Sequence, residues 1–476
     1  YEIASCLVGS EMCIRDRHHA GRQNEAILGT SWGLLELFEP MIPKYWDIAL
    51  PLARKMMGVI MPPLENNPTL HELQKYIFFP TVSASNVPLD PSRTGLPPSR
   101  VHRLTQLEIK LLEKQFVEAA VRVKAAGCDG VELHASHGYL FQQFLSPYTN
   151  RRHDKYGGSL ENRMRFLLET IDGVHKACGR DFPISIRLTV DEMYDTIGEA
   201  GKGLTVDEGV QIAKRLEQAG VDVLDLSCGC YETPNHTVEP MGVPEGWRAY
   251  MVKAVKDAVN IPVISVGVIR NPAFAEKLLE DGVQDFIGLG RPLLADPEWA
   301  KKAKEGRTEE IQRCINCLAC FQMLFENAFK FEPTQCALNP RCLRELEYND
   351  RTLPKNGAGR KVVVVGAGPA GLTAARELAD RQFDVTVLEK ASCSGGQLNA
   401  ANKPPHKDKM NWAITDLTYR AEKAGAKILY DQTVTEETLR GYSPYAIILA
   451  TGGAAGVPRS IPGADKETAV SYTHLD

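Results

Sequence analysis

Two spacings of apolar residues alternate along the middle of the chain, one typical of strands and one typical of helices. Short apolar runs that are typical of buried strands occupy five segments: Asp129–His134, Pro183–Leu188, Asp222–Ser227, Pro262–Gly267 and Asp285–Gly290. Apolar positions at helical spacing fill the intervals, at about 159–178, 205–219, 246–259 and 271–281. Strictly alternating strands and helices predict an α/β fold with a parallel sheet whose strands are joined by crossover helices.

Two helix starts are marked by a Thr-x-x-Glu capping box, at Thr105–Glu108 and at Thr205–Glu208. The first box begins an amphipathic helix that we predict to end near Ala126. The pattern alone leaves two architectures open, a (β/α)8 TIM barrel and a doubly wound open sheet. Together with a strand remnant near His19–Arg22, the predicted strands would be strands three to eight of an incomplete barrel whose first strands are missing.

The end of the first predicted strand carries the residues best suited to catalysis. His134 closes the strand, His137 follows three positions later, and Tyr139 comes next. Two imidazoles and a phenol can hold a carbonyl oxygen and supply a proton. A single buried histidine is more often a structural residue, but a His–His–Tyr group just past a strand end favours a catalytic site.

Composition and charge narrow the class of protein. The 476 residues are enough for two to four domains, and 43% hydrophobic with 24% charged residues is ordinary for a globular protein. A net charge of −5 gives no reason to expect a nucleic-acid or anionic-membrane partner. No apolar run reaches the roughly 18–20 residues of a membrane span. We expect a cytoplasmic enzyme, since cysteines at metal-type spacing in a chain without a secretory signal indicate a reducing compartment.

The two ends of the chain differ from the rest. Residues 1–17 and 470–476 have no periodicity that relates them to the segments beside them, and we interpret both as foreign, adaptor-like sequence. A secretory signal is the rival interpretation of the first segment. Its apolar part is too short and is broken by charged residues, including Glu11 and Arg15.

Four cysteines follow the last predicted strand of the sheet. Cys314, Cys317 and Cys320 lie in one tight loop, and Cys336 follows after fifteen intervening residues. Four thiolates suit either a zinc site or a 4Fe–4S cluster. Three cysteines in one loop with a remote fourth favour the cluster, and Cys342 stays open as an alternative ligand.

The last segment has the pattern of a dinucleotide-binding unit. The strand Lys361–Val365 leads into Gly366, Gly368 and Gly371 and an alanine-rich helix, and the next strand ends at Glu389. Strand, glycines, helix, strand and acid within thirty residues predict pyrophosphate at the helix N-terminus and ribose hydroxyls at Glu389.

Longer motifs resemble a known family. His134–Leu140 reads HASHGYL, and Phe144–Phe166 reads FLSPYTNRRHDKYGGSLENRMRF. Both are similar to the old yellow enzyme family of flavin-dependent oxidoreductases. The QCALNP segment around Cys336 resembles the iron–sulfur branch, which includes 2,4-dienoyl-CoA reductase, enoate reductase and trimethylamine dehydrogenase. SGGQL, which contains Gln397, and AIILATGG resemble the FAD half of flavoproteins with two dinucleotide domains, which favours FAD over NAD at the last unit.

The resemblance implies a set of domains. It favours the barrel over the open sheet and implies an FMN-binding barrel at 18–310, with an insertion at 24–80. An iron–sulfur segment at 311–357 and a partial Rossmann-like FAD-binding domain at 358–469 follow. The insertion is expected to be either a cap over the active site or a homo-oligomer contact. The chain is expected to be truncated at both ends, and an inactive fragment is one of the hypotheses.

The resemblance also implies roles for individual residues. Gly267, Gly290 and Arg291 would bind the FMN phosphate. Arg187 would face the flavin ring, with a salt bridge at the barrel rim as the alternative. His134 and His137 would bind the carbonyl oxygen of an α,β-unsaturated substrate while Tyr139 protonates the α-carbon.

The expected function is that of an ene-reductase. Electrons would pass from NAD(P)H through FAD and a 4Fe–4S cluster to FMN, and then as hydride to the C=C bond of an enoate, enone or dienoyl-CoA. An amine dehydrogenase is the competing class. That branch carries tyrosine where His134 stands, so the histidine favours a carbonyl ligand.

Overall fold

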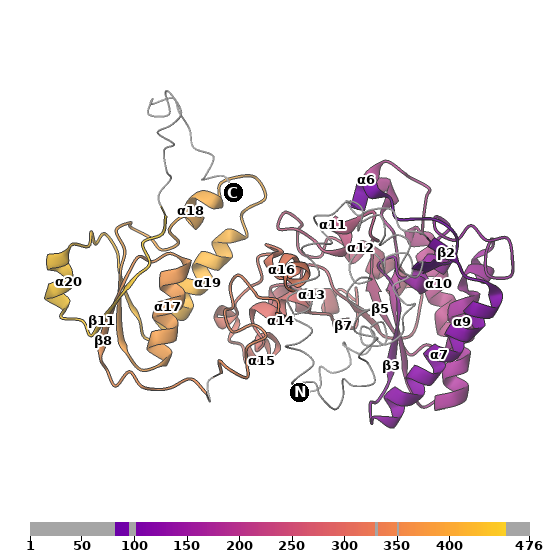
Figure 1. The fold of residues 1–476 in the computed structure, drawn as a ribbon, viewed down its shortest axis with the longest axis horizontal. Coiled ribbons are helices and arrows are strands. Elements are labelled where there is room, and N and C mark those ends of the chain that lie inside the picture. Colours follow the sequence, from indigo (N-terminus) through magenta and orange to yellow (C-terminus); the bar gives the residue numbers. More distant parts are fainter. Residues whose placement is uncertain (1–80, 95–100, 329–331, 350–351, 454–476) are drawn as a thin grey trace, which may run out of the picture.

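The computed structural model describes residues 81–94, 101–328, 332–349 and 352–453. Two α/β units follow one another along the chain, and the cysteine-bearing segment joins them (Figure 1). Several predictions lie outside the described residues: the foreign segments at the two ends, the strand remnant near His19–Arg22, the insertion at 24–80, and the stretch 454–469.

The first unit is built on parallel strands. Its strands are β1 (Thr81–Ser83), β2 (Val101–Arg103), β3 (Val131–Ala135), β4 (Ile184–Thr189), β5 (Val223–Ser227), β6 (Val263–Ser265) and β7 (Phe286–Ile287). The last five pair in the order β3-β4-β5-β6-β7, and β1 pairs with β2. Each of the five strands lies beside its successor, as in the wall of a (β/α)8 barrel, whereas a doubly wound sheet reverses direction at a switch point. The sheet order therefore confirms the barrel, and the pair β1–β2 was not predicted.

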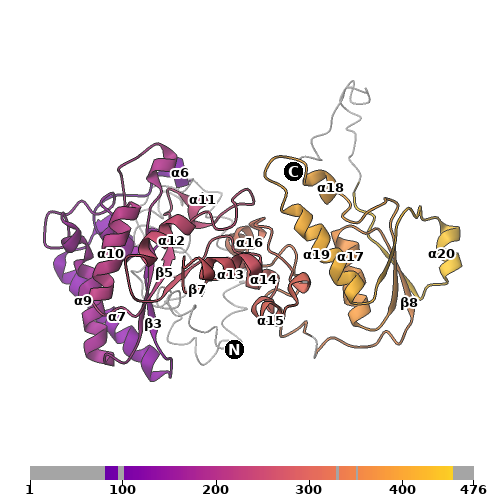
Figure 2. The same ribbon diagram turned by 180° about the vertical axis from the view of Figure 1, so that it is seen from behind.

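Helices alternate with these strands. They are α6 (Pro91–Thr94), α7 (Gln106–Ala125), α8 (Leu140–Leu145), α9 (Leu160–Cys178), α10 (Val206–Gln218), α11 (Pro234–Thr237), α12 (Ala249–Lys256), α13 (Pro272–Glu280), α14 (Arg291–Ala295), α15 (Trp299–Lys304) and α16 (Ala319–Ala328), with short 3-10 turns η4 (Tyr194–Ile197) and η5 (Thr308–Glu310). Figure 2 shows α7, α9 and α10 on the outer side of the sheet. They cover the fully buried apolar residues of the strands, such as Leu133 and Ile186.

One of the two predicted capping boxes is confirmed. At the start of α7, the backbone N–H of Thr105 donates to Glu108 Oε2 at 2.7 Å, and Thr105 Oγ1 accepts from the N–H of Glu108. The prediction of a capping box at Thr205 is wrong, because the Thr205 side chain makes no capping hydrogen bond to the helix. Its intended partner Glu208 instead accepts a hydrogen bond from Arg163 on α9. A tertiary ion pair has replaced the local cap.

The second unit is a four-stranded parallel sheet. Its strands are β8 (Lys361–Val365), β9 (Asp384–Leu388), β10 (Lys427–Leu429) and β11 (Ala446–Leu449), in the order β10-β9-β8-β11. Its helices are α17 (Pro369–Asp380), α18 (Leu398–Ala401), α19 (Met410–Lys423) and α20 (Glu436–Tyr442). The central strand β8 leads directly into the glycine-rich turn, as a Rossmann-like unit requires.

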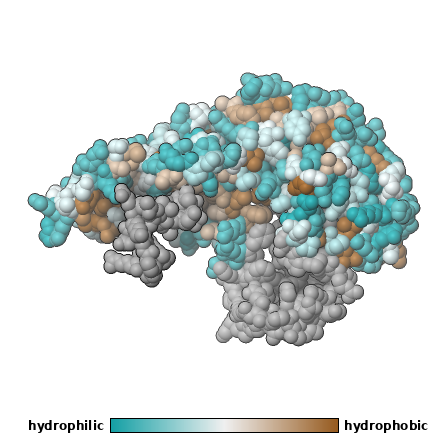
Figure 3. Space-filling model, turned by 90° about the horizontal axis from the view of Figure 1, so that it is seen from above, coloured by the Kyte–Doolittle hydropathy of each residue, from teal (hydrophilic) through white to brown (hydrophobic). Residues whose placement is uncertain are grey.

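The surface of the molecule mixes polar and apolar side chains. In Figure 3 the apolar groups are small and lie between hydrophilic ones over the described part of this face. Among the described helices, none has the length and hydropathy to cross a membrane.

Candidate active site

The three predicted catalytic residues lie together at the C-terminal end of β3. The ring of His134 lies 5.3 Å from that of His137 and 5.1 Å from that of Tyr139, between centroids. The chain turns sharply here because His137 and Gly138 both have positive φ, of 57° and 79°. A non-glycine residue rarely adopts this backbone conformation, so the turn has to be held by its surroundings.

Side chains from the next two strands hold this turn. Thr189, the last residue of β4, accepts the backbone N–H of His137 at 3.0 Å, and its Oγ1 lies 2.7 Å from Ser136 Oγ. Ser227, the last residue of β5, has its Oγ 2.7 Å from Nε2 of His137. Sequence reasoning missed both residues. Their only signal is their place, since the carboxyl ends of barrel strands meet at the catalytic face.

The barrel-facing side of the sheet is polar beside His134. The strand register places Arg187 of β4 opposite His134, and Asp225 of β5 opposite Arg187. Arg187 Nη1 and Asp225 Oδ2 form an ion pair at 3.1 Å. Two residues back along β3, Glu132 accepts a hydrogen bond from Ser185. The salt bridge expected as the alternative role for Arg187 is therefore present.

Both histidines are held neutral. Burial, and next the charge of Arg187, lower the pKa of His134 to about 3. The same two causes lower the pKa of His137 well below its ordinary value. His134 makes no hydrogen bond to any other described residue. At neutral pH one of its ring nitrogens is an N–H donor without a positive charge.

A second tyrosine stands behind Tyr139. The hydroxyl oxygens of Tyr139 and Tyr231 are 3.4 Å apart, and the rings meet edge to face. Burial raises the pKa of Tyr231. Tyr231 follows the end of β5, so β3 and β5 each supply one phenol to the site.

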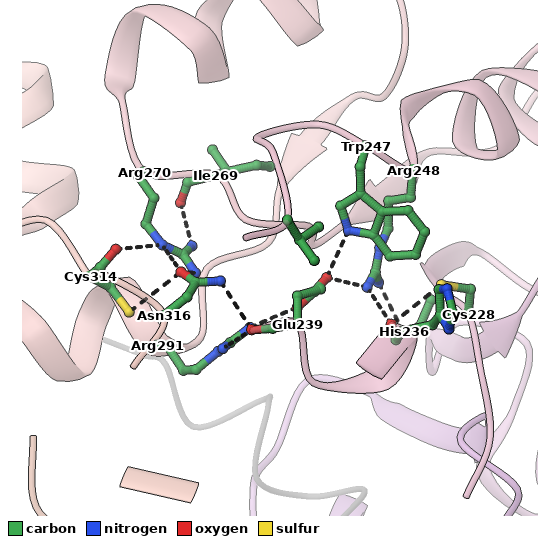
Figure 4. A network of polar contacts seen from close by, with 12 residues as sticks. Cys228, His236, Glu239, Trp247, Arg248, Ile269, Arg270, Arg291, Cys314 and Asn316 are labelled. Carbon is green, nitrogen blue, oxygen red and sulfur yellow. Dashed lines mark hydrogen bonds and ion pairs between the residues drawn. The ribbon is translucent and has the colours of Figure 1, made fainter. Parts of the chain in front are cut away.

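The predicted phosphate-binding residues lie at the ends of β6 and β7, where they meet a buried ionic network (Figure 4). Arg291 donates to Glu239 Oε2 at 2.7 Å, and Arg248 forms an ion pair with the other oxygen of Glu239. A Cβ on Gly267, whose φ is 152°, would come within 3.0 Å of Arg248, while a Cβ on Gly290 would meet no atom within 4 Å. Gly290 thus faces open space, and Gly267 makes room for the arginine.

The network extends to the cysteine segment. The buried guanidinium of Arg270 donates to the backbone oxygen of Cys314 at 3.1 Å and to Asn316 Oδ1 at 3.0 Å. Asn316 Nδ2 in turn donates to the Glu239 backbone oxygen (Figure 4). Within the described residues the Arg270 guanidinium has only neutral acceptors, and Arg248 and Arg291 share one carboxylate. A second carboxylate, Glu245, accepts the backbone N–H of Arg270 at 2.6 Å. The three guanidiniums still outnumber these two carboxylates, which favours an anionic ligand.

The four predicted metal ligands are near one another but do not form a metal site here. Burial and the charges of Cys314 and Cys317 raise the pKa of Cys320, and burial raises that of Cys336 to about 11. No three His, Cys, Asp or Glu side chains of the described chain converge as metal ligands. Asn316 and Leu318 have positive φ, of 54° and 62°. Left-handed residues of this kind turn backbone N–H groups inward, as in anion-binding and iron–sulfur loops.

In the second unit, the glycines close the turn after β8. A Cβ on Gly371 would lie 1.9 Å from the backbone oxygen of Gly366, and a Cβ on Gly366 would lie 2.4 Å from that of Ala450. A Cβ on Gly368, at the start of α17, would meet nothing within 4 Å. Two glycines are therefore required for packing, and the third leaves space at the helix N-terminus, the position at which dinucleotide-binding units hold a pyrophosphate.

Glu389 and Gln397 lie around the same turn. The Glu389 carboxylate accepts the backbone N–H groups of Ala367 and Ala391, at 2.6 and 2.9 Å. Gln397 donates to the backbone oxygen of Gly453 at 2.7 Å and so connects the two segments that resemble FAD-binding motifs. In this structure Glu389 supports the glycine turn directly.

Comparison with known proteins now decides the family. The family described as NADH:flavin oxidoreductase / NADH oxidase matches residues 64–310, which is more than half of the chain. The chain belongs to this family. A second match, described as pyridine nucleotide-disulphide oxidoreductase, covers residues 360–476.

Two curated relatives illustrate the range of the NADH:flavin oxidoreductase family. NADH oxidase of Thermoanaerobacter brockii is 46% identical over 375 residues, covering 78% of this chain and 56% of the relative. Cinnamate reductase of Clostridium sporogenes is 35% identical over 382 residues, with the same two coverages. The chain thus spans little more than half the length of these relatives.

Solved structures of the family include both reductases and amine dehydrogenases. A 2-naphthoyl-CoA reductase in complex with 2-naphthoyl-CoA has a TM-score of 0.71 and 33% identity, covering 78% of this chain and 55% of that one. Histamine dehydrogenase from Rhizobium sp. 4-9 has a TM-score of 0.69 and 31% identity, covering 80% and 54%.

The residues present fit a flavin in the barrel. The buried Nε of Arg187 and Oδ1 of Asp225 have no hydrogen-bond partner in the described part of the chain. Buried polar atoms are normally paired, so these two favour a polar ligand beside His134. The excess of positive charge at Arg248, Arg270 and Arg291 fits the FMN phosphate, which would bind near the ends of β6 and β7.

Proposed function

We propose that the protein is an NAD(P)H-dependent ene-reductase that acts on the C=C bond of an α,β-unsaturated carbonyl compound. The observation that carries the proposal is the group His134, His137 and Tyr139, whose rings gather at the C-terminal end of β3 with both imidazoles neutral. Neutral N–H donors match a carbonyl oxygen, which gains negative charge as the reaction proceeds.

Each side chain has a separate task. His134 and His137 would donate hydrogen bonds to the substrate carbonyl oxygen, and Ser227 orients His137. The hydroxyl of Tyr139 would give its proton to the α-carbon and recover one by way of Tyr231. Bound FMN would supply the hydride to the β-carbon. Arg187, beside His134 and with one free N–H, would donate to the flavin ring.

The rest of the chain would deliver electrons. Cys314, Cys317, Cys320 and Cys336 would hold a 4Fe–4S cluster, whose chemistry converts paired electrons into single ones. The turn Gly366–Gly371 with Glu389 and Gln397 would hold FAD, and NAD(P)H would be the source. Arg291, Gly267 and Gly290 would bind the FMN phosphate. We propose a cytoplasmic location, with a small-molecule unsaturated carbonyl substrate and NAD(P)H as partners.

Amine oxidation is the second candidate, since histamine dehydrogenase is among the structures that this chain resembles. It requires a site that accepts an amine instead of a carbonyl oxygen. His134 stands where the amine-oxidising branch carries tyrosine, and its neutral imidazole can donate a hydrogen bond to a carbonyl oxygen.

One spectroscopic experiment separates the two candidates. The holoenzyme is purified without oxygen, its flavin, iron and sulfide contents are measured, and it is reduced with NADH. Flavin reoxidation is then followed as 2-enoates, enones or tertiary amines are added. Rapid reoxidation by an enoate or enone supports the ene-reductase. If these compounds have no effect while an amine reduces the oxidised flavin, the dehydrogenase assignment replaces it.

A further inference from the structure

Helix α19 of the second unit has one face made mainly of charged residues, which on a surface helix would normally be exposed to solvent. Lys409 just before the helix, then Ala413, Asp416, Arg420 and Lys423, follow one another at intervals of four and three positions. Such residues lie on one face of a helix. Both ribbon views place α19 on the side of its unit nearest the cysteine segment (Figures 1 and 2).

The C-terminal part of this face follows the residues that lead to the first cysteine. Lys423 Nζ lies 3.2 Å from Glu310 Oε1. Arg420 donates to Gln312 Oε1. Asp416 accepts the backbone N–H of Arg313 at 2.9 Å and its Nη2 at 2.6 Å. The segment from Glu310 to Arg313 therefore runs antiparallel to the helix, with successive contacts in reverse order.

The N-terminal part of the face meets the barrel and the fourth cysteine. Lys409 Nζ donates to the backbone oxygens of Met241 and Val243, at 2.6 and 2.9 Å. Trp412 packs in a small apolar cluster with Cys336, and the Arg313 guanidinium lies 5.1 Å from the centre of the Trp412 ring. The helix thus touches Arg313, the residue before Cys314, and shares an apolar cluster with Cys336.

Burial distinguishes these contacts from incidental surface pairs. Asp416 is 4% exposed and Lys409 is 5% exposed. Exposed ion pairs contribute little to stability and specificity, whereas a buried carboxylate that loses its partner is strongly unfavourable. Asp416 therefore requires Arg313 at this place, and the two units have a specific relative position.

We propose that α19 is the docking helix between the dinucleotide-binding unit and the cysteine segment, and that Asp416 is a positioning residue for electron transfer between them. The proposal rests on the proposed function, in which the two electrons given up by NAD(P)H are the two that reduce FMN, with protons exchanged with water. Transfer between carriers depends steeply on their separation, and α19 holds Arg313, the residue before Cys314, through Asp416.

The test compares Asp416→Ala with wild type in the holoenzyme. Glu436→Gln is the matched control, since Glu436 forms an exposed pair with Arg440 in the same unit. Hydrogen–deuterium exchange is read over residues 310–317. Anaerobic stopped-flow absorbance follows the first flavin reduction by NADH and the later reduction of the second flavin as separate phases.

The expected result for Asp416→Ala is faster amide exchange at residues 312–314 and a second phase slowed at least about tenfold, with the first phase unchanged. Asp416→Glu should restore part of the rate. A second phase as fast as in wild type would overturn the proposal. If Asp416→Ala does not fold, Lys409→Met at the other end of the helix is compared with wild type by the same two measurements.

The outcomes also separate this proposal from the proposed function. A wild-type protein without iron and sulfide, or with no second phase, contradicts the electron relay itself. In that case faster exchange in Asp416→Ala would show the docking contact alone, and the positioning role would be wrong. The control Glu436→Gln should match wild type in both measurements.

Discussion

The turn after β8 and the turn after β3 are built by different means. Gly366, Gly371 and backbone atoms of Ala450 close the first, with no space for a Cβ. Side chains of Thr189 and Ser227 close the second, although they lie 52 and 90 positions from His137 along the chain. The dinucleotide turn therefore depends on close approach of backbone atoms, whereas the active-site turn depends on side chains that the neighbouring strands supply.

Replacing Gly371 should have the largest effect. In Gly371→Val, side-chain atoms would have to occupy space where even a Cβ would lie 1.9 Å from the Gly366 oxygen. We expect loss of the second flavin from the protein while FMN is retained, measured as FAD and FMN released on denaturation. Gly441→Ala is the control, since a Cβ there meets nothing within 4 Å. Wild-type FAD content in Gly371→Val would contradict the account of this turn.

Acid should destabilise the barrel through His134 and His137, which are half-buried and held neutral. The pKa of His134 is about 3 in the folded chain and about 6.5 when unfolded. The unfolded chain therefore binds a proton between these values that the folded chain does not, and stability falls as the pH falls through this window. Each such histidine contributes up to about 1.4 kcal/mol per pH unit.

Urea unfolding at several pH values in this window measures the effect. His134→Asn should have a smaller loss of unfolding free energy between about pH 6.5 and about pH 4 than wild type has. An unchanged pH dependence would mean that His134 is not held neutral by burial and Arg187.

Removing the support of the active-site turn should have an intermediate effect. Thr189→Val keeps the shape of the side chain but loses the hydrogen bonds to Ser136 and to the His137 backbone. We expect kcat to fall about tenfold or more through misplacement of the imidazole, with FMN content unchanged. Thr418→Val is the control, since among the described residues that hydroxyl bonds only to the Ile414 backbone oxygen of its own helix. Equal kcat in both variants would show that the hydrogen bonds of Thr189 are not needed to hold the active-site turn.

The two Thr-x-x-Glu segments provide the smallest effect. Thr105→Ala removes an observed cap and should lower the unfolding free energy by about 0.5–2 kcal/mol, whereas Thr205→Ala should cost much less because it caps nothing. Thermal or urea unfolding of both variants makes the comparison. Equal losses would contradict the assigned difference between the two helix starts.

Much of the fold could be predicted from the sequence because its signals are local. The strands β3–β6, the helices between them and the glycine turn all follow from periodicity and short motifs. The second capping box failed because Arg163, 45 positions away, binds the Glu208 carboxylate. Pairing of β1 with β2 has no local signal, since each strand has only three residues.

The candidate site could be predicted only in part. His134, His137 and Tyr139 stand in one motif, but Ser227, Asp225 and Glu239 become visible only when the strand ends meet. The contacts of α19 could not be predicted, because charged residues at helical spacing are typical of a solvated helix. Their partners, such as Arg313 and Met241, lie more than 100 positions away along the chain.

The most direct test of the central claim uses Tyr139→Phe and His134→Asn in the proposed ene-reductase. The reduced holoenzyme is mixed with an enoate or enone without oxygen, and the rate of flavin reoxidation is measured in water and in deuterium oxide. We predict that Tyr139→Phe binds FMN normally but reacts roughly 10²–10⁴-fold more slowly, since a positioned general acid contributes about that much. Reoxidation of both variants at the wild-type rate would show that this group does not bind and protonate the substrate.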